Sequence, residues 1–501
     1  MDREAKKIEP ILKELGDVPA EEFRAQLHQL ADWVADYRKN IEQIRVSPDA
    51  KPGALTRKFP KQGPEQGEPF DRIFADFKNL IVPGVLHWGH PQFAAYFGST
   101  STAPGLHGEI LASAFNVNAM TWRTCPAATE LETVVLDWLR QWLHLPDTFG
   151  GILYDTASIG IMHALAVARE EAAPGTRKLG LTGRDLPVFR IYTSDQAHSS
   201  VEKAAIALGI GEGNVVRVPT NSEFQMDVVK LREIVERDRQ ENFKPLACIA
   251  TVGTTSTASV DPVAEISRVC REHGIWLHID GAYGAGAALL PEFEWLTNGW
   301  AAADSIIVNP HKMLFVQFDF SVLYVRDLER LRRVFTLVPE YLVGDTLEAE
   351  KNYMDYGVQL GRKFRALKAW MVFRTFGRTG IIARIREHFR LAQLLAEWIR
   401  SDSRFELSAP VVMGVICFRF VGPVAGVGDA GPGSTTPATT DGKLDQLNSD
   451  IVENVNASGR AYLNQTKLNG RTVIRVGLGN VLTTEEHLRN VWQLIQKAAT
   501  D

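Results

Sequence analysis

One lysine stands between two apolar runs in the stretch IIVNPHKMLF, residues 306–315. An ammonium group rarely enters apolar surroundings without a partner or a function. The amine of Lys312 could form a Schiff base with an aldehyde, which is how many lysines act in covalent catalysis. A lysine that reaches out from a surface loop is the commoner case, so this stretch alone supports both interpretations.

A carboxylate follows another apolar run, because Asp280 closes IWLHID and precedes GAYGAGAALL. At a strand end, a carboxylate can cap the next helix, bind a metal or pair with a buried cation. The dinucleotide-binding pattern fails here, because residues 284–289 lack the third glycine of G-x-G-x-x-G. A zinc site at Cys270, His273 and His278 also fails, because no second pair of ligands accompanies them.

Two further motifs offer groups that suit an anion and an aromatic ring. Thr156, Ala157 and Ser158 directly precede a long helix, and a helix start offers free N–H groups and a positive dipole end to phosphate. His198 lies in the turn TSDQAHSS, where its imidazole could stack on a ring. Each motif alone is more often structural, as an N-cap or a buried histidine. Together with a lysine amine and a carboxylate, they predict a site for pyridoxal phosphate.

Short β-branched runs alternate with amphipathic helices in the central part of the chain. This alternation predicts a mostly parallel sheet with helices on both faces. Ligands of such sheets bind at the carboxyl ends of the strands, and the chemical groups described above directly follow strands. The predicted strands cover residues 189–194, 214–220, 246–253, 275–280, 304–309 and 321–327.

The two flanks of this central part differ in character. The first hundred residues predict helices broken by a polar linker, too few to bury their apolar faces alone, so we expect them to pack on something else, such as another subunit. Long helices and strand-like runs after residue 362 predict an α+β unit. Its Gly-, Pro- and Thr-rich segment 422–443 is typical of a mobile surface loop. The predicted domains are an N-terminal helical segment (1–101), a large α/β domain (102–378) and a small C-terminal α+β domain (379–501).

Composition excludes several classes of protein. The 501 residues carry a net charge of −5, so no basic field favours nucleic acid or an anionic membrane. No apolar run approaches the roughly 18 residues that a membrane helix requires, and the charged N-terminus lacks the apolar core of a signal peptide. Four cysteines without a C-x-x-C pair favour a reducing compartment. We therefore expect a cytoplasmic protein that binds neither nucleic acid nor a membrane.

Several blocks, in the same order along the chain, are similar to those of a known family. The chain resembles the group II pyridoxal-phosphate-dependent decarboxylases, most closely the aromatic-L-amino-acid decarboxylase branch. The resemblance implies the aspartate-aminotransferase-like fold (fold type I), pyridoxal 5'-phosphate as cofactor, and a homodimer with active sites at the interface and N-terminal helices that clasp the partner. The blocks are PGVLHWGHPQFAAYF (83–97), ATELETVVLDWL (128–139), TSDQAHSSVEKA (193–204), TVGTTSTASVDP (251–262), WLHIDGAYGAGAALLPEF (276–293), NPHKML (309–314) and LGRKFRALKAWMVFRTFG (360–377).

The resemblance also implies roles for individual residues of the cofactor site. Lys312 matches the Schiff-base lysine, Asp280 the partner of the pyridine nitrogen, and His198 the imidazole that stacks on the cofactor ring. The other matched positions lie around the phosphate or near the cofactor, and they are Thr156, Ala157, Ser158, Thr255, Asn309 and His311.

A tyrosine is the expected proton donor. In the family, a mobile loop before the LGR block carries a tyrosine that protonates the product carbon, and the matching stretch here, 338–363, predicts a polar loop with Tyr353 at that position. Relatives with phenylalanine there form aldehydes, so Tyr353 favours simple decarboxylation.

The resemblance also indicates where the substrate lies. The expected substrate is an aromatic amino acid such as tryptophan, tyrosine or a hydroxylated relative, which is converted to its amine and CO2. The segments expected to form the pocket carry little positive charge that could pair with the second carboxylate of glutamate, and Arg123 is the nearest candidate. This argues against glutamate as the substrate. Alternatives left open are oxidative deamination to an aldehyde, a non-aromatic substrate and a catalytically silent relative. The predicted pocket residues are Trp88, Tyr96, Phe97, Gly98 (where the aromatic enzymes usually have proline), Asn118 and Met120.

Overall fold

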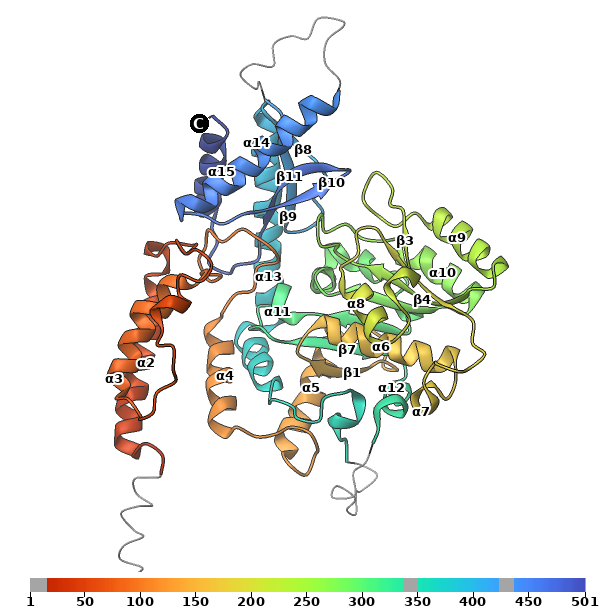
Figure 1. Cartoon of the computed structure of the whole chain (residues 1–501), viewed down its shortest axis with the longest axis horizontal. Coiled ribbons are helices and arrows are strands. Elements are labelled where there is room, and N and C mark those ends of the chain that lie inside the picture. Colours follow the sequence, from red (N-terminus) through yellow and green to blue (C-terminus); the bar gives the residue numbers. More distant parts are fainter. Residues whose placement is uncertain (1–15, 338–349, 423–436, 501) are drawn as a thin grey trace, which may run out of the picture. The chain divides into compact units, whose positions relative to one another are not determined.

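The computed structural model describes residues 16–337, 350–422 and 437–500, with no side chains given for 437–441. The chain divides into two compact units, Met1–His90 and Pro91–Asp501 (Figure 1). The first unit contains α2 (Ala20–Lys39) and α3 (Phe70–Asp76). The rings of Trp33, Tyr37, Phe74 and Phe77 pack together in it. No residue of α2 is buried, in agreement with an expected segment that cannot bury its own apolar face.

The second unit contains a seven-stranded sheet in the order β1-β7-β6-β5-β4-β2-β3. The strands from β3 to β6 are parallel, whereas β7 is antiparallel to both β6 and β1. Each predicted strand is present, and the mostly parallel sheet is confirmed. The bounds are β1 (Gly150–Tyr154), β2 (Phe189–Ser194), β3 (Val215–Val218), β4 (Lys244–Thr251), β5 (Trp276–Gly281), β6 (Ser305–Val308) and β7 (Ser321–Val325).

Within the large sheet, β1 is the one strand that the sequence did not predict. It begins with two glycines, which lower strand propensity. A Cβ on Gly150 would lie 2.8 Å from the Leu328 side chain, and one on Gly151 would lie 2.8 Å from the ring of Tyr324. The glycines are therefore required by close packing, although they hide the strand in the sequence.

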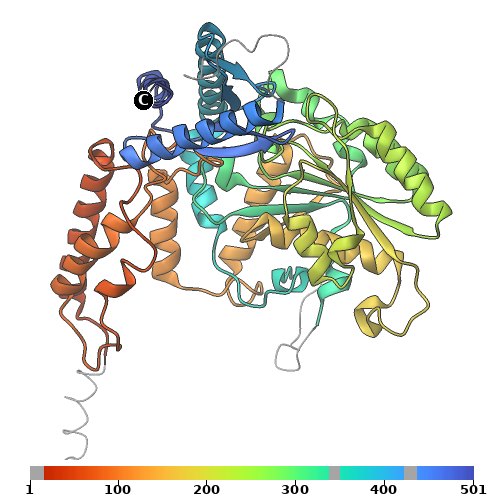
Figure 2. The ribbon, with the colours of Figure 1, turned by 45° about the horizontal axis from the view of Figure 1, so that its top comes forward.

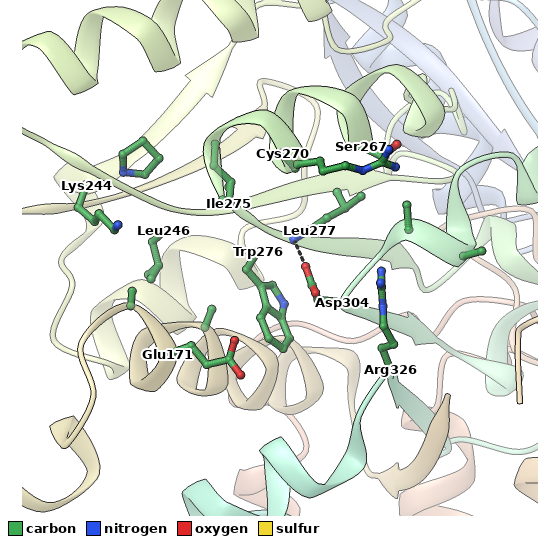
Figure 3. A pocket seen from close by; sticks show the side chains of 17 residues that line it. Glu171, Lys244, Leu246, Ser267, Cys270, Ile275, Trp276, Leu277, Asp304 and Arg326 are labelled. Atoms are coloured by element: carbon green, nitrogen blue, oxygen red, sulfur yellow. Dashed lines mark hydrogen bonds between the residues drawn. The ribbon is translucent and has the colours of Figure 1, made fainter. Parts of the chain in front are cut away.

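Helices cover both faces of the large sheet (Figures 1 and 2). Helix α6 contacts β4, β5, β6 and β7, whereas α9 and α10 contact β4. Figure 3 shows α6 and α10 on opposite sides of the strands. The helices in this layer are α5 (Pro126–Trp142), α6 (Ala157–Ala172), α8 (Ser200–Ala207), α9 (Val228–Gln240), α10 (Val263–His273) and α12 (Leu328–Phe335).

A second, antiparallel sheet has the order β10-β11-β9-β8. The long helical element α13 (Ala366–Ser401) contacts α4 (Ala103–Phe115), α5, β8 and β9, and is interrupted at Gly377, where φ is 62° and ψ is 166°. The predicted loop 422–443 lies largely outside the described residues, but 437–443 begin a helix instead. The remaining bounds are β8 (Phe405–Leu407), β9 (Val415–Phe420), α14 (Pro437–Ser458), β10 (Asn464–Leu468), β11 (Arg471–Gly477) and α15 (Glu485–Ala498).

The two sheets occupy different parts of the sequence, residues 150–325 and 405–477. The predicted domain boundaries at 101 and 378 remain predictions. Across the described ranges, no helix is long and apolar enough to cross a membrane.

Candidate active site

A cavity of about 160 Å³ lies at the carboxyl ends of the parallel strands. Strands β2, β4, β5 and β6 each lead into residues that line it, as expected for this type of sheet. All the residues that the sequence predicted for cofactor binding line this one cavity. They are Thr156, Ala157, Ser158, His198, Thr255, Asp280, Asn309, His311 and Lys312.

Lys312 lies on the short helix α11 (Pro310–Met313), directly after β6. Its Nζ is 4.7 Å from the ring centroid of Phe97. Burial lowers the pKa of Lys312 to about 8, opposed by the negative charge of Asp280 and assisted by the positive charge of Arg475. Near neutral pH, part of this lysine is therefore an unprotonated amine, the form that attacks an aldehyde.

Asp280 is the last but one residue of β5, a strand buried along its whole length, and is 6% exposed. Its Oδ1 accepts the N–H of Ala282 at 3.1 Å, which leaves most of the carboxylate's hydrogen-bonding capacity for another partner. A protonated ring nitrogen is such a partner, and its charge complements that of the carboxylate.

His198 also faces the cavity, from the turn after β2. Its Nδ1 accepts the backbone N–H of Ser200 at 3.1 Å, so the ring proton resides on Nε2. Burial is the main cause that lowers the pKa of His198, and Asp280 and Lys312 act on it in opposite directions. The ring is therefore largely neutral at neutral pH and presents a flat face to a ligand.

The start of α6 forms the anion-binding end of the cavity. Thr156 is its N-cap, and no side chain caps the helix, so the N–H groups of Ala157 and Ser158 remain available. Asn309 lies close to this helix start, because the Ser321 hydroxyl contacts both the Asp155 carbonyl at 3.4 Å and Asn309 Oδ1, which accepts from it at 2.7 Å. His311 is held by the backbone of Phe320, since its Nδ1 lies 2.8 Å from that carbonyl oxygen.

Arg475 is a further charged group that the sequence analysis missed. It lies on β11 of the small sheet, and its guanidinium carbon is 5.0 Å from the Phe97 ring centroid. Its Nε donates to the carbonyl of Ser256 at 3.1 Å and its Nη1 to that of Tyr96 at 2.7 Å. Its Nη2 is buried without a hydrogen-bond partner among the described residues. The only signal in the sequence is one arginine between apolar residues in TVIRVGLG.

The surroundings of Tyr353 differ from the exposed polar loop that the sequence predicted. This residue lies in a short helical turn and is 1% exposed, not on an exposed polar loop. Its hydroxyl bonds with that of Thr133 at 2.9 Å, and Arg362 stacks on its ring at 4.8 Å. Tyr353 is not among the residues that line the cavity of its own chain, and its role as the proton donor stays a prediction. The remainder of the predicted loop, 338–349, lies outside the described residues.

The predicted substrate pocket is only partly assembled at the cavity. Phe97 lines it and stacks on Tyr283, with ring centroids 4.0 Å apart. Tyr96 contributes the carbonyl bound by Arg475, and a Cβ on Gly98 would lie 3.2 Å from the Gly479 backbone, so a larger residue there would be crowded. Asn118 and Met120 contact each other at 3.4 Å and do not line the cavity. Trp88 belongs to the first unit.

These groups identify the class of protein. A free amine, a carboxylate, a flat imidazole and an uncapped helix start around one cavity fit pyridoxal 5'-phosphate, and the protein is an enzyme that uses this cofactor. The family described as pyridoxal-dependent decarboxylase conserved domain matches residues 52–421. The chain belongs to that family and is a pyridoxal-phosphate-dependent amino-acid decarboxylase with the aspartate-aminotransferase-like fold.

Three relatives show the range of similarity. The chain is 36% identical to an aromatic-L-amino-acid decarboxylase of Catharanthus roseus, covering 97% of this chain and 96% of the relative. It is 35% identical to a phenylacetaldehyde synthase of a Rosa hybrid cultivar, covering 96% and 94%. The crystal structure of Oryza sativa TDC with PLP and tryptamine superposes with a TM-score of 0.90 at 35% identity, covering 97% and 99%.

Proposed function

We propose that this enzyme converts an aromatic L-amino acid, such as tryptophan, tyrosine or a hydroxylated relative, to its amine and CO2. The observation that carries the proposal is one cavity in which Lys312, Asp280, His198 and the start of α6 meet beside the stacked rings of Phe97 and Tyr283. Relatives named for aromatic amino acids support it.

Each residue has a distinct proposed task at the cofactor. Lys312 Nζ binds the aldehyde, Asp280 keeps the ring nitrogen protonated, and His198 packs on the ring face. The start of α6 and the residues beside it hold the phosphate. When bound, the cofactor accepts the electron pair left on Cα as CO2 departs. The residues proposed for the phosphate end are Thr156, Ala157, Ser158, Thr255, Asn309 and His311.

Arg475 does not itself line the cavity, but its guanidinium packs on Phe97, which does, and it is proposed to orient the substrate carboxylate. Its Nε and Nη1 are fixed by backbone carbonyls, so Nη2 is held in place without a partner of its own. A carboxylate would supply that partner through a charge-assisted hydrogen bond. A guanidinium fixed in this way would hold the carboxylate in one orientation, so it would favour loss of this group as well as binding of the substrate.

A second carboxylate in the substrate finds little support. Arg123, the cation that the sequence analysis considered for this role, pairs with Glu350 at 3.0 Å. The wall formed by Phe97 and Tyr283 suits an aromatic ring instead.

Two groups that can carry a proton, Lys312 Nζ and His198 Nε2, belong to residues that line the cavity. Within the described part of the chain, they are the candidates at this cavity for returning a proton to Cα.

We also propose a homodimer with active sites at the interface. Helix α4 exposes Ile110, Leu111 and Phe115 by 49%, 41% and 64%, an apolar surface that a second copy would cover. Asn118 and Met120, which do not line the cavity of their own chain, would then serve the partner's cavity. Free thiols at all four cysteines support the expected cytoplasmic location.

The test is a screen of CO2 release from purified enzyme across the aromatic amino acids, with glutamate and histidine as controls. Release from at least one aromatic substrate, with equimolar amine, is expected. Activity on glutamate alone would refute the proposed substrate class.

Oxidative deamination is the second candidate, because aldehyde synthases stand among the relatives. That reaction consumes O2 and water and yields aldehyde, CO2, ammonia and hydrogen peroxide in equal amounts. Measuring peroxide and ammonia beside CO2 in the same assay separates the two reactions. Peroxide equimolar with CO2 would replace the first proposal by the second.

A further inference from the structure

Three side chains stand in one row on β5 and lead towards the cofactor cavity. Trp276, His278 and Asp280 alternate along the strand, so they share a face. Figure 3 shows the Trp276 indole directed towards α6, which identifies that face. Trp276 also forms a wall of a larger cavity, about 820 Å³, at the amino-terminal ends of β4 and β5. The row therefore runs from this larger cavity, at the amino-terminal end of the strand, to Asp280, which lines the cofactor cavity at the other end.

A hydrogen-bonded pair of side chains fixes the middle of the row. Trp276 Nε1 can only donate, so Ser305 Oγ accepts from it at 2.9 Å. Ser305 pairs with His278 across the sheet, and its Oγ lies 2.8 Å from His278 Nδ1. The Ser305 hydroxyl accepts from the indole and still has its own hydrogen to donate. We therefore assign Ser305 as the donor to His278 Nδ1. His278 then carries its proton on Nε2.

The Nε2–H group has no partner among the described residues. His278 is 0% exposed, and Nε2 is buried without a hydrogen bond. Asp280 is the next residue on the same face, and among the described residues its carboxylate accepts a hydrogen bond only from the Ala282 N–H. Asp280 also acts electrostatically on the His278 ring. The His278 ring and the Asp280 carboxylate make no hydrogen bond to each other, so the ring acts on the carboxylate through the electric field of its dipole.

We propose that His278, oriented by Ser305, is a positioning residue that strengthens the pairing of Asp280 with the pyridine nitrogen. The inference rests on the proposed contact between Asp280 and the pyridine nitrogen. A neutral imidazole supplies a dipole without a competing positive charge, and burial lowers the pKa of His278 to about 4, so the ring stays neutral at working pH. Protonation of Nδ1 would also break its bond with Ser305.

The experiment compares three variants of the holoenzyme. His278→Phe removes the dipole, Ser305→Ala releases the imidazole, and Ser267→Ala is a matched control, since this other buried hydroxyl bonds to Ala264 on α10 at 2.8 Å. Cofactor labelled with 15N at the pyridine nitrogen reports its protonation by NMR, and kinetics report kcat and KM separately. Thermal unfolding of each apo-protein checks the fold.

Loss of the dipole should weaken the Asp280–pyridinium pair. In His278→Phe we expect the pyridine nitrogen to lose its proton about one pH unit lower, and kcat to fall roughly tenfold with KM little changed. Ser305→Ala should shift both in the same direction by less, and Ser267→Ala should match the wild type. If His278→Phe does not fold, the test is the comparison of Ser305→Ala with Ser267→Ala in the same two measurements.

Two outcomes separate the failure of this inference from that of the proposed function. If Asp280→Asn abolishes the protonated nitrogen signal while His278→Phe and Ser305→Ala equal the wild type, His278 has no positioning role. If Asp280→Asn itself leaves the signal and turnover unchanged, the proposed role of Asp280 is wrong, and the inference falls with it.

Discussion

Replacing Arg475 by methionine tests the proposed carboxylate contact. Methionine keeps an unbranched side chain of similar reach beside Phe97, and it removes the charge and every N–H group. Because Nε and Nη1 already serve backbone carbonyls, Nη2 alone is left for the substrate. One hydrogen bond between charged groups contributes about 1.5–3 kcal/mol, so kcat/KM should fall roughly 10- to 100-fold.

The assay compares ligands with and without a carboxylate. The product amine lacks this group, so its inhibition constant should be unchanged in Arg475→Met, whereas inhibition by the amino acid's α-methyl analogue should weaken as much as kcat/KM. Removal of the positive charge of Arg475 should also raise the pKa of Lys312, because that charge now helps to lower it. A shift of the pH profile to higher pH provides an independent readout.

A matched control separates charge from geometry. Arg475→Lys keeps a positive charge but cannot reproduce the contacts to both Ser256 and Tyr96, so we expect partial loss. Cofactor absorbance and thermal unfolding show whether each variant stays loaded and folded. Arg475→Met with kcat/KM within threefold of the wild type, or with equal loss of affinity for the product amine, would refute the reasoning.

Three further outcomes follow from other contacts. The pKa of Lys312 is about 8 in the folded protein and 10.5 in the unfolded chain, so between these pH values only the unfolded chain binds the proton, and the stability of the apo-protein should rise with pH. In thermal unfolding, Lys312→Met should lack this rise. The same variant should also form no visible absorption band with the cofactor. Glu132→Ala strands the buried Arg362, its partner at 2.7 Å, and should cost about 3–5 kcal/mol in urea unfolding. Tyr353→Phe loses one bond to Thr133, about 1 kcal/mol, and if Tyr353 is the acid it should lose amine formation at nearly normal stability. Unchanged amine formation would refute the predicted role of Tyr353.

Local sequence predicted much of this site because the sheet is mostly parallel. In such a sheet, strand ends meet at one edge, so Asp280 and Lys312 could be brought together from their positions after two buried runs. The start of α6 and the turn with His198 follow the same rule. Each of these residues precedes or follows a regular element, and short-range patterns suffice to place it.

The parts that sequence reasoning missed depend on contacts between distant segments. Arg475 comes from the second sheet and packs on Phe97, which lines the cavity, and nothing in the apolar run around Arg475 indicates which surface its guanidinium meets. Tyr353 lies in a polar stretch that reads as exposed, yet Thr133 and Arg362 enclose it. The glycines of β1 likewise look unfavourable for a strand until Tyr324 and Leu328 are placed over them.

The division of the site between two sheets affects where mutations can act. Lys312 follows a strand of the large sheet and Arg475 lies in the small one, and α13 contacts elements of both parts. Gly377 interrupts this helix in a backbone region that almost only glycine adopts, with no neighbouring atom that a Cβ would meet. A side chain there would create backbone strain without any clash, although Gly377 does not line the cavity. Variants that alter reaction choice in such an enzyme can therefore lie far from every atom that the substrate touches.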